Sequence, residues 1–212
     1  MTTSVDIADL LRAARIVPVL TIQDVATAVP LASALVAGGV RTLEVTLRTP
    51  VGAKAAEAIM AAVPGAIVGL GTVLTRRDLE LAEAIGATFA FSPGATPDLL
   101  DAAAEAAILF VPGIATASEL MAAMTRGFTT VKLFPAAQLG GTEALKALGG
   151  PFPEARFCPT GGISEKKALD YLALPNVVAV GGSWLAPSAE VAAGNWTAIE
   201  ARARRAMSGT SP

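Results

Sequence analysis

The chain repeatedly alternates a short run of β-branched and apolar residues with an alanine-rich stretch of helical character. Such alternation predicts a parallel sheet, because consecutive parallel strands need a crossover connection that is usually a helix. Eight of these units predict a closed TIM-type (β/α)8 barrel, with an open, doubly wound sheet as the main alternative. The expected strands are residues 16–20, 42–47, 66–71, 88–92, 108–111, 129–134, 156–160 and 177–181.

The helices between these strands are expected to begin at capping residues or prolines. A capping side chain accepts a hydrogen bond from a free N–H group of the first turn, and proline has no N–H group to leave free. A short amphipathic helix is expected within residues 1–14, and the tail is helical to about residue 206. No linker or break in composition divides the chain, so we expect a single domain over residues 1–212. The helix start signals are Asp24, Pro50, Thr75, Thr96-Pro97, Thr116, Glu143 and Ser164.

The composition excludes several kinds of function. Apolar residues make up 53% of the chain and charged residues 16%, which provides for a large core. The formal net charge is −2 without a long basic run, so binding to nucleic acid or to a membrane surface is not expected. The absence of histidine excludes serine–histidine and cysteine–histidine hydrolases, and argues with the single cysteine, Cys158, against a zinc site.

The same sequence favours a cytoplasmic location. Cys158 has no partner for an internal disulfide, as is usual in a reducing compartment. Residues 1–14 lack the basic start and apolar segment of a signal peptide, and no apolar run reaches the length of a membrane span.

One lysine lies inside an apolar strand. It is found in the stretch Thr129-Thr130-Val131-Lys132-Leu133-Phe134-Pro135. An unpaired ammonium is costly to bury, and burial lowers the pKa of a lysine. An uncharged amine near neutral pH is a nucleophile toward carbonyl carbons. Lys132 therefore indicates Schiff-base chemistry.

A second polar pattern lies on the expected strand 42–47. Period-two alternation places Thr42, Glu44, Thr46 and Arg48 on one face of this strand. The other face must meet apolar helices, so we expect the polar face to line the barrel interior, with Glu44 and Arg48 pointing toward its mouth. A buried Lys132–Glu44 ion pair could also serve the core alone. The arginine at the strand end and the glycine loops described next favour a functional site.

Two glycine-rich loops follow the last two expected strands. They are Pro159-Thr160-Gly161-Gly162-Ile163-Ser164 and Gly181-Gly182-Ser183. In (β/α)8 barrels these two loops often bind phosphate through backbone N–H groups, because glycine allows a close approach and positive φ angles. One glycine pair is typical of any turn, whereas two such loops at these positions favour a phosphate site.

Other loops at the same ends of the strands contribute a polar rim. Thr72 follows Gly69-Leu70-Gly71 and is expected to bind a carboxylate together with Arg48. Pro93 and the Pro112-Gly113 pair shape the rim. Arg15 lies at the opposite end of the first strand and is interpreted as structural.

At these residues the chain resembles the class I 2-dehydro-3-deoxy-phosphogluconate (KDPG) aldolases, a family that includes 4-hydroxy-2-oxoglutarate (KHG) aldolases. The matching stretches run in order along nearly the whole chain. They are LEVTLRT (residues 43–49), GLGTVL (69–74), FSPG (91–94), VKLFPA (131–136), RFCPTGGI (156–163) and GGSWL (181–185).

The resemblance implies a (β/α)8 barrel, a homotrimer, and neither metal nor cofactor. It makes Lys132 the Schiff-base lysine and Glu44 the general acid/base. Arg48 and Thr72 would bind the pyruvate carboxylate, and the remaining site residues divide between the pocket and the phosphate. The pocket residues are Pro93, Phe134 and Thr160, and the phosphate-binding residues are Gly161, Gly162, Gly182 and Ser183.

The implied reaction is the reversible cleavage of a small phosphorylated keto acid, KDPG, to pyruvate and D-glyceraldehyde 3-phosphate, a step of the Entner-Doudoroff pathway. KHG, and the galactonate isomer of KDPG, are further candidate substrates. Two other functions stay open from the residues alone. A phosphosugar isomerase or epimerase would use Glu44 as a base without a covalent adduct, and a non-catalytic phosphosugar-binding protein would not turn its ligand over.

Overall fold

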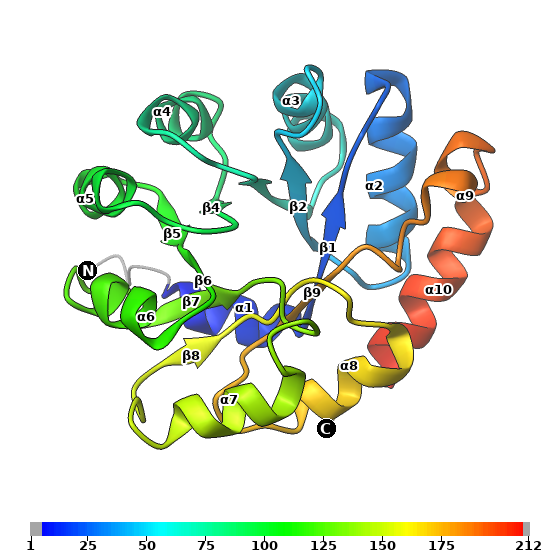
Figure 1. The fold of residues 1–212 in the computed structure, drawn as a ribbon. Helices are drawn as coiled ribbons and strands as arrows, with labels where there is room; N and C mark the ends of the chain where they lie inside the picture. Colours follow the sequence, from blue (N-terminus) through cyan, green and yellow to red (C-terminus); the bar gives the residue numbers. More distant parts are fainter. Residues whose placement is uncertain (1–5, 210–212) are drawn as a thin grey trace, which may run out of the picture.

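The computed structural model describes residues 6–209 and contains the expected alternation of strands and helices (Figure 1). The helix expected within residues 1–14 is α1 (Ile7–Ala14), and residues 1–5 lie outside the described part of the chain. The Asp6 side chain caps α1 by accepting a hydrogen bond from the Ala8 N–H. Arg15 ends this helix with a φ of 58°, at the amino end of the first strand.

Every strand pair in the structure is parallel, as the alternation predicts. The strands are β1 (Ile16–Leu20), β2 (Thr42–Thr46), β3 (Ile67–Gly71), β4 (Phe89–Phe91), β5 (Leu109–Val111), β6 (Gly113–Ile114), β7 (Thr130–Leu133), β8 (Arg156–Phe157) and β9 (Val180–Gly182).

The strands form a six-stranded sheet in the order β5-β4-β3-β2-β1-β9 and a three-stranded sheet in the order β6-β7-β8. Strands β1 to β5 follow one another in space without the reversal of order that defines a doubly wound sheet, so that alternative is wrong. The two sheets are connected in two places. Only Pro112 separates β5 from β6, and isolated parallel bridges join Phe157 to Val177 and Thr160 to Gly181.

Helices lie around the outside of the strands (Figure 1). The helix that follows β1 is preceded by a 3-10 turn. Asp24 caps this turn, and the helix therefore begins three residues later than expected, at Ala28. Capping boxes at Thr75 and Thr116 hold two of the starts. The helical segments are η1 (Val25–Thr27), α2 (Ala28–Ala37), α3 (Gly52–Ala62), α4 (Arg76–Ala84), α5 (Pro97–Glu105), α6 (Ala117–Met124), α7 (Gly141–Gly149), α8 (Glu165–Leu172), α9 (Ser188–Ala192) and α10 (Trp196–Ser208).

Further elements differ from the sequence prediction, among them the last strand, which is expected at 177–181 and is regular only at β9. The strand expected at 156–160 is regular only at β8, because Pro159 has no N–H to donate to a ladder. The short strand β6 was not predicted, since Pro112 and Gly113 are typical of a turn. The helical tail is divided into α9 and α10 at Gly194, which has a φ of 66°.

The core has an inner and an outer part. The outer part packs the outward side chains of the strands against the surrounding helices, as Leu43 and Val45 of β2 do. The inner part contains Leu11 of α1 together with inward side chains of several strands, among them Phe91 and Val111. Helix α1 therefore covers the interior, and the polar residues of β2 and β7 lie in a water-poor environment.

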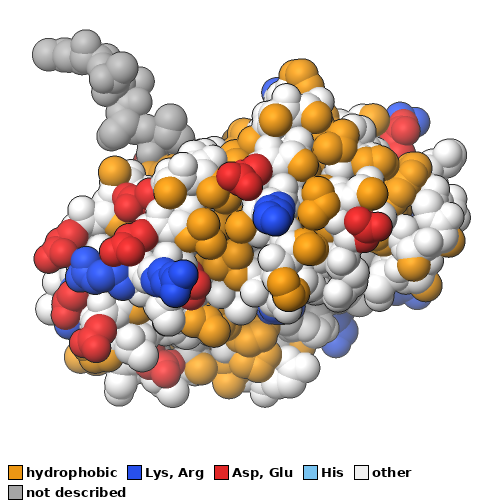
Figure 2. Space-filling model, turned by 90° about the horizontal axis from the view of Figure 1, so that it is seen from above, with side chains coloured by type: hydrophobic (Ala, Val, Ile, Leu, Met, Phe, Trp, Pro, Cys, Tyr) orange, Lys and Arg blue, Asp and Glu red, His pale blue; other side chains and the backbone are white. Residues whose placement is uncertain are grey.

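The surface carries no large area of one charge on the face over α2, α3 and α4, where Figure 2 shows acidic and basic side chains scattered among hydrophobic ones. This distribution agrees with the net charge of −2. Within residues 6–209, no helix combines the length and apolar character needed to span a membrane.

Candidate active site

Lys132 and Glu44 meet in the interior, although 88 positions separate them along the chain. Lys132 is the third residue of β7 and Glu44 the third of β2. The lysine Nζ donates hydrogen bonds to both carboxylate oxygens, at 2.9 Å to Oε1 and 3.3 Å to Oε2. The side chains are 2% and 0% exposed, respectively. Alternation along each strand correctly predicted that both would point inward.

Small residues make room for this pair. A Cβ atom on Gly71 would lie 2.2 Å from Glu44 Oε1, so any larger side chain at the end of β3 would displace the carboxylate. Two phenylalanine rings flank the amine, with Nζ at 5.3 Å from the Phe91 ring centroid and 5.8 Å from that of Phe134. The Phe91 ring thus covers the ion pair on one side, and the Phe134 ring lies on the other.

Arg48 and Thr72 lie next to each other at the ends of neighbouring strands. The Arg48 side chain follows β2 and donates a hydrogen bond from Nε to Thr72 Oγ1 at 3.1 Å. Thr72 directly follows β3 with a φ of 61°, a backbone conformation that is rare for a β-branched residue. Arg48 is exposed, which leaves the rest of its guanidinium free to bind an anion.

The two glycine loops also meet, but they use glycine in different ways. Gly161 and Gly162 have φ angles of 99° and 70°, and the sequence predicts such positive values. Gly181 and Gly182 have no positive φ, and they are needed for space instead. A Cβ on Gly181 would lie 2.2 Å from Thr160 Oγ1, and one on Gly182 would overlap the Trp184 ring.

A cavity of about 90 Å³ gathers most of the predicted site residues. It shares Val19, Arg48 and Ser183 with a second cavity of about 560 Å³ that extends toward α9. The predicted residues that line the smaller cavity are Arg48, Phe134, Thr160, Gly161, Gly162, Gly182 and Ser183.

Three further predicted residues do not line the cavity but lie next to residues that do. Lys132 and Glu44 adjoin it at Phe134, and Thr72 is held at Arg48. Pro93 does not line it. Pro93 packs instead against Gly113 of β6, where a Cβ would lie 2.2 Å from the Pro93 carbonyl carbon.

Two residues near the pair were not predicted to belong to the site. Phe91 could have been found, because alternation places it on the inward face of its strand. Cys158 lies within electrostatic reach of Lys132 and Glu44, and burial raises the pKa of its thiol to about 12. This thiol stays protonated at neutral pH and does not compete with the amine as a nucleophile.

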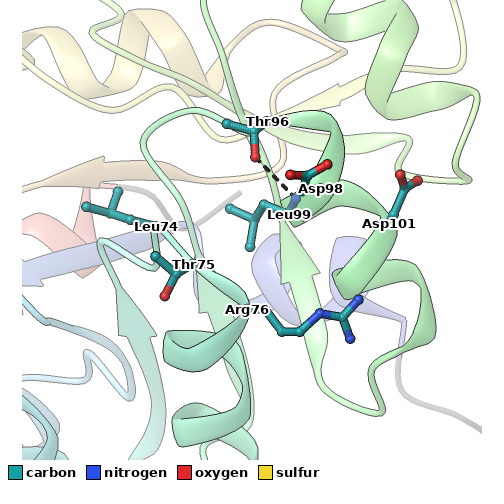
Figure 3. Close-up of a pocket in the computed structure, with 7 residues that line it drawn as sticks. All are labelled: Leu74, Thr75, Arg76, Thr96, Asp98, Leu99 and Asp101. Atoms are coloured by element: carbon teal, nitrogen blue, oxygen red, sulfur yellow. Dashed lines mark hydrogen bonds between the residues drawn. The ribbon is translucent and has the colours of Figure 1, made fainter.

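A larger cavity of about 590 Å³ lies elsewhere, between the start of α4 and α5 (Figure 3). Its polar groups serve the helices and the surface. Thr96 Oγ1 accepts a hydrogen bond from the Leu99 N–H, Asp101 pairs with Arg126, and Arg76 lies 3.6 Å from Glu105. No chemistry is assigned to it. Among residues 6–209, no three His, Cys, Asp or Glu side chains are grouped so as to hold a metal ion.

The chain matches a known protein family over most of its length. The model of the family described as "KDPG and KHG aldolase" matches residues 7–202. The chain belongs to this family. Family membership rests on almost the full length of the chain, and the buried pair, the glycine loops and the cavity all lie within the matched part.

Individual relatives agree with that assignment. A 2-dehydro-3-deoxy-phosphogluconate aldolase of Pseudoalteromonas atlantica is 54% identical over 92% of this chain and 91% of its own. A KHG/KDPG aldolase of Escherichia coli is 52% identical over 92% and 91%. The crystal structure of a KDPG aldolase from Legionella pneumophila, with pyruvate captured as a covalent carbinolamine intermediate, superposes with a TM-score of 0.91. It is 44% identical and covers 94% of this chain and 97% of that one.

Proposed function

We propose that this chain is a class I aldolase that reversibly cleaves KDPG to pyruvate and D-glyceraldehyde 3-phosphate through a Schiff base on Lys132. The observation that carries the proposal is the buried Lys132–Glu44 pair, with Nζ 2.9 Å from Oε1. It joins a nucleophile to a proton acceptor within direct transfer distance. The names of the relatives and the carbinolamine in the Legionella structure support the same chemistry.

In the first half of the reaction, Lys132 gains a bond to C2 of the keto acid. Nζ passes a proton along its hydrogen bond to Glu44, and the amine lone pair attacks the carbonyl carbon. A proton then moves from the nitrogen to the former carbonyl oxygen, which completes the carbinolamine. Its hydroxyl takes the proton held by Glu44 and leaves as water, so that a protonated imine remains. Glu44 is again a carboxylate at this point.

In the second half, the imine accepts the electrons of the C3–C4 bond. Glu44, directly or through a water molecule, removes the C4 hydroxyl proton, the C3–C4 bond breaks, and the aldehyde leaves. The enamine on Lys132 is then protonated at C3 and hydrolysed to pyruvate. Since the chain contains no histidine, one carboxylate carries most of these proton transfers.

The polar groups around the pair hold the substrate in place. Arg48 and Thr72 bind the carboxylate of the pyruvate moiety, and Phe134 and Thr160 border the keto acid. Gly161, Gly162, Gly182 and Ser183 bind the phosphate. This orientation contributes a large part of the rate, because it replaces a bimolecular encounter by a fixed geometry.

Borohydride trapping tests this function. Reduction in the presence of pyruvate should attach a reduced pyruvate to the peptide that contains Lys132, as detected by mass spectrometry after digestion. The exposed Lys54, Lys146, Lys166 and Lys167 provide internal controls and should stay unmodified. An isomerase or epimerase would form no adduct, so an unmodified protein would exclude the aldolase mechanism.

Ser183→Ala is expected to weaken the use of phosphorylated substrate selectively. A hydrogen bond to a charged group contributes about 1.5–3 kcal/mol, so kcat/KM for KDPG should fall roughly 10- to 100-fold. The value for KHG, which has no phosphate, should change less than about twofold by the same reasoning. Steady-state pyruvate release measures both.

A matched control for that substitution is Ser33→Ala, on the exposed surface of α2. It should leave both substrates unaffected. Equal losses for KDPG and KHG in the Ser183 variant would contradict the phosphate assignment. The same assay with the galactonate isomer ranks the three keto acids by kcat/KM.

We also propose a closed (β/α)8 barrel over residues 1–212 as one domain, which assembles as a homotrimer in the cytoplasm. The strand order and the bridges from Phe157 and Thr160 to the last strand segment support closure. The buried, protonated thiol of Cys158 fits a reducing compartment. Sedimentation velocity at assay concentration tests the trimer.

A further inference from the structure

The Lys132 amine faces two aromatic rings that differ in their surroundings. Phe134 lines the substrate cavity and is partly exposed. Phe91 is 0% exposed and lies on the inner side of the pair, with its ring centroid 5.3 Å from Nζ. Phe91 therefore affects the reaction through its contact with the Lys132 nitrogen and not by lining the substrate cavity.

The ring of Phe91 is held firmly in this place. Strand β4 is hydrogen-bonded between β3 and β5, and Phe91 pairs with Gly71 on one side and Val111 on the other. Its ring packs against that of Phe89, with 5.2 Å between centroids and 50° between planes. A buried ring with fixed neighbours offers the nitrogen the same face before and after a substrate binds.

Formation of the imine changes the number of hydrogen bonds that the Lys132 nitrogen can donate. An ammonium has three N–H groups, and Lys132 directs hydrogen bonds to both oxygens of Glu44. A protonated imine keeps one N–H, while its positive charge spreads over nitrogen and C2. Hydrogen bonding to Glu44 is then reduced, whereas an aromatic face attracts a cation without needing a donor group.

We propose that Phe91 is a positioning residue that stabilises the protonated imine on Lys132 through the face of its ring. The inference rests on the proposed Schiff-base function and adds a partner for its cationic intermediate. The second partner is the carboxylate of Glu44, and the outer face of the imine is left for Phe134 and the substrate. Phe91 thereby shifts the equilibrium between free amine and imine toward the imine.

The first test compares Phe91→Leu with Phe157→Leu. Both side chains are fully buried, but Phe157 belongs to the outer core and has no contact with Nζ. Borohydride trapping over a range of pyruvate concentrations measures the imine equilibrium. The pyruvate concentration for half-maximal adduct should rise about tenfold in Phe91→Leu, as expected for a buried cation–π contact, and stay unchanged in Phe157→Leu.

The second test keeps the shape of the side chain and does not depend on the leucine variant folding. Phenylalanine at position 91 is replaced by its mono-, di- and trifluoro analogues, which progressively weaken the negative potential of the ring face. The half-maximal pyruvate concentration should rise with each fluorine. A value independent of fluorination, with normal trapping in the unmodified protein, would overturn the proposal and leave the aldolase function intact. Absence of trapping in the unmodified protein would instead overturn both.

Discussion

Lys132→Met is expected to abolish aldol cleavage, with a loss of roughly 10⁵-fold or more in kcat, because the covalent route to the imine disappears and enzymes typically accelerate reactions by at least about 10⁶-fold. Methionine matches the length of the lysine stem and suits the apolar surroundings of Phe91 and Phe134. Pyruvate release in a coupled assay measures the loss, and borohydride with pyruvate should leave this variant unmodified.

The same substitution should also destabilise the fold. It leaves the Glu44 carboxylate, which is 0% exposed, without its partner, and breaking a buried ion pair from one side costs about 3–5 kcal/mol. The double variant Lys132→Met/Glu44→Gln removes both charges and should regain most of that stability without regaining activity. Denaturant unfolding of the single and double variants measures the difference.

Two outcomes would contradict this account. Substantial cleavage by a folded Lys132→Met protein would exclude Lys132 as the nucleophile. A double variant that regained activity along with stability would show that the ion pair serves the core alone, which is the structural interpretation left open by the sequence.

Glu44→Gln is expected to lower kcat by about 10²- to 10⁴-fold, the usual contribution of a positioned general acid or base. Glutamine keeps the shape and a hydrogen-bond acceptor for Nζ, but it neither takes the amine proton nor gives one to the leaving water. Most proton transfers in the proposed mechanism pass through this carboxylate, so both imine formation and C3–C4 cleavage should become slow.

The kinetics of trapping separate this role from a purely structural one. Borohydride should still trap pyruvate on Lys132 in Glu44→Gln, but the rate of adduct formation should fall together with kcat. A variant that forms the adduct at the normal rate and loses only cleavage would assign Glu44 to the second half-reaction alone. Normal rates in both halves would remove Glu44 from the mechanism. Ser33→Ala on the exposed surface of α2 serves again as the control, because it lies outside the site and leaves the carboxylate untouched.

Much of the fold could be predicted because its signals are local. Apolar runs identified every parallel strand region except β6, and the caps at Thr75, Thr96 and Thr116 were found at the predicted helix starts. The errors in element boundaries arose where a single proline or glycine changes the allowed backbone conformation. Pro159 shortened β8, and Gly194 divided the helical tail.

The sequence predicted which residues lie at the site better than it predicted how they are arranged. Period two indicated that Glu44 and Lys132 point inward, and most of the predicted pocket and loop residues line one cavity. Pro93, which the resemblance places in the pocket, does not line this cavity, and its backbone lies against Gly113 of β6. The glycines at 181 and 182 were expected to allow both a close approach and positive φ angles, and they serve only the close approach, of Thr160 and Trp184.

The sequence by itself determined which side chains face the interior and which loops are rich in glycine, because side-chain period and glycine content are properties of short segments. Only the tertiary structure decided that Nζ of Lys132 lies 2.9 Å from Glu44, that Arg48 holds Thr72, and that Phe91 turns its ring toward the amine. These distances join strands that are far apart along the chain. They depend on strand order, register and packing, which no single segment encodes.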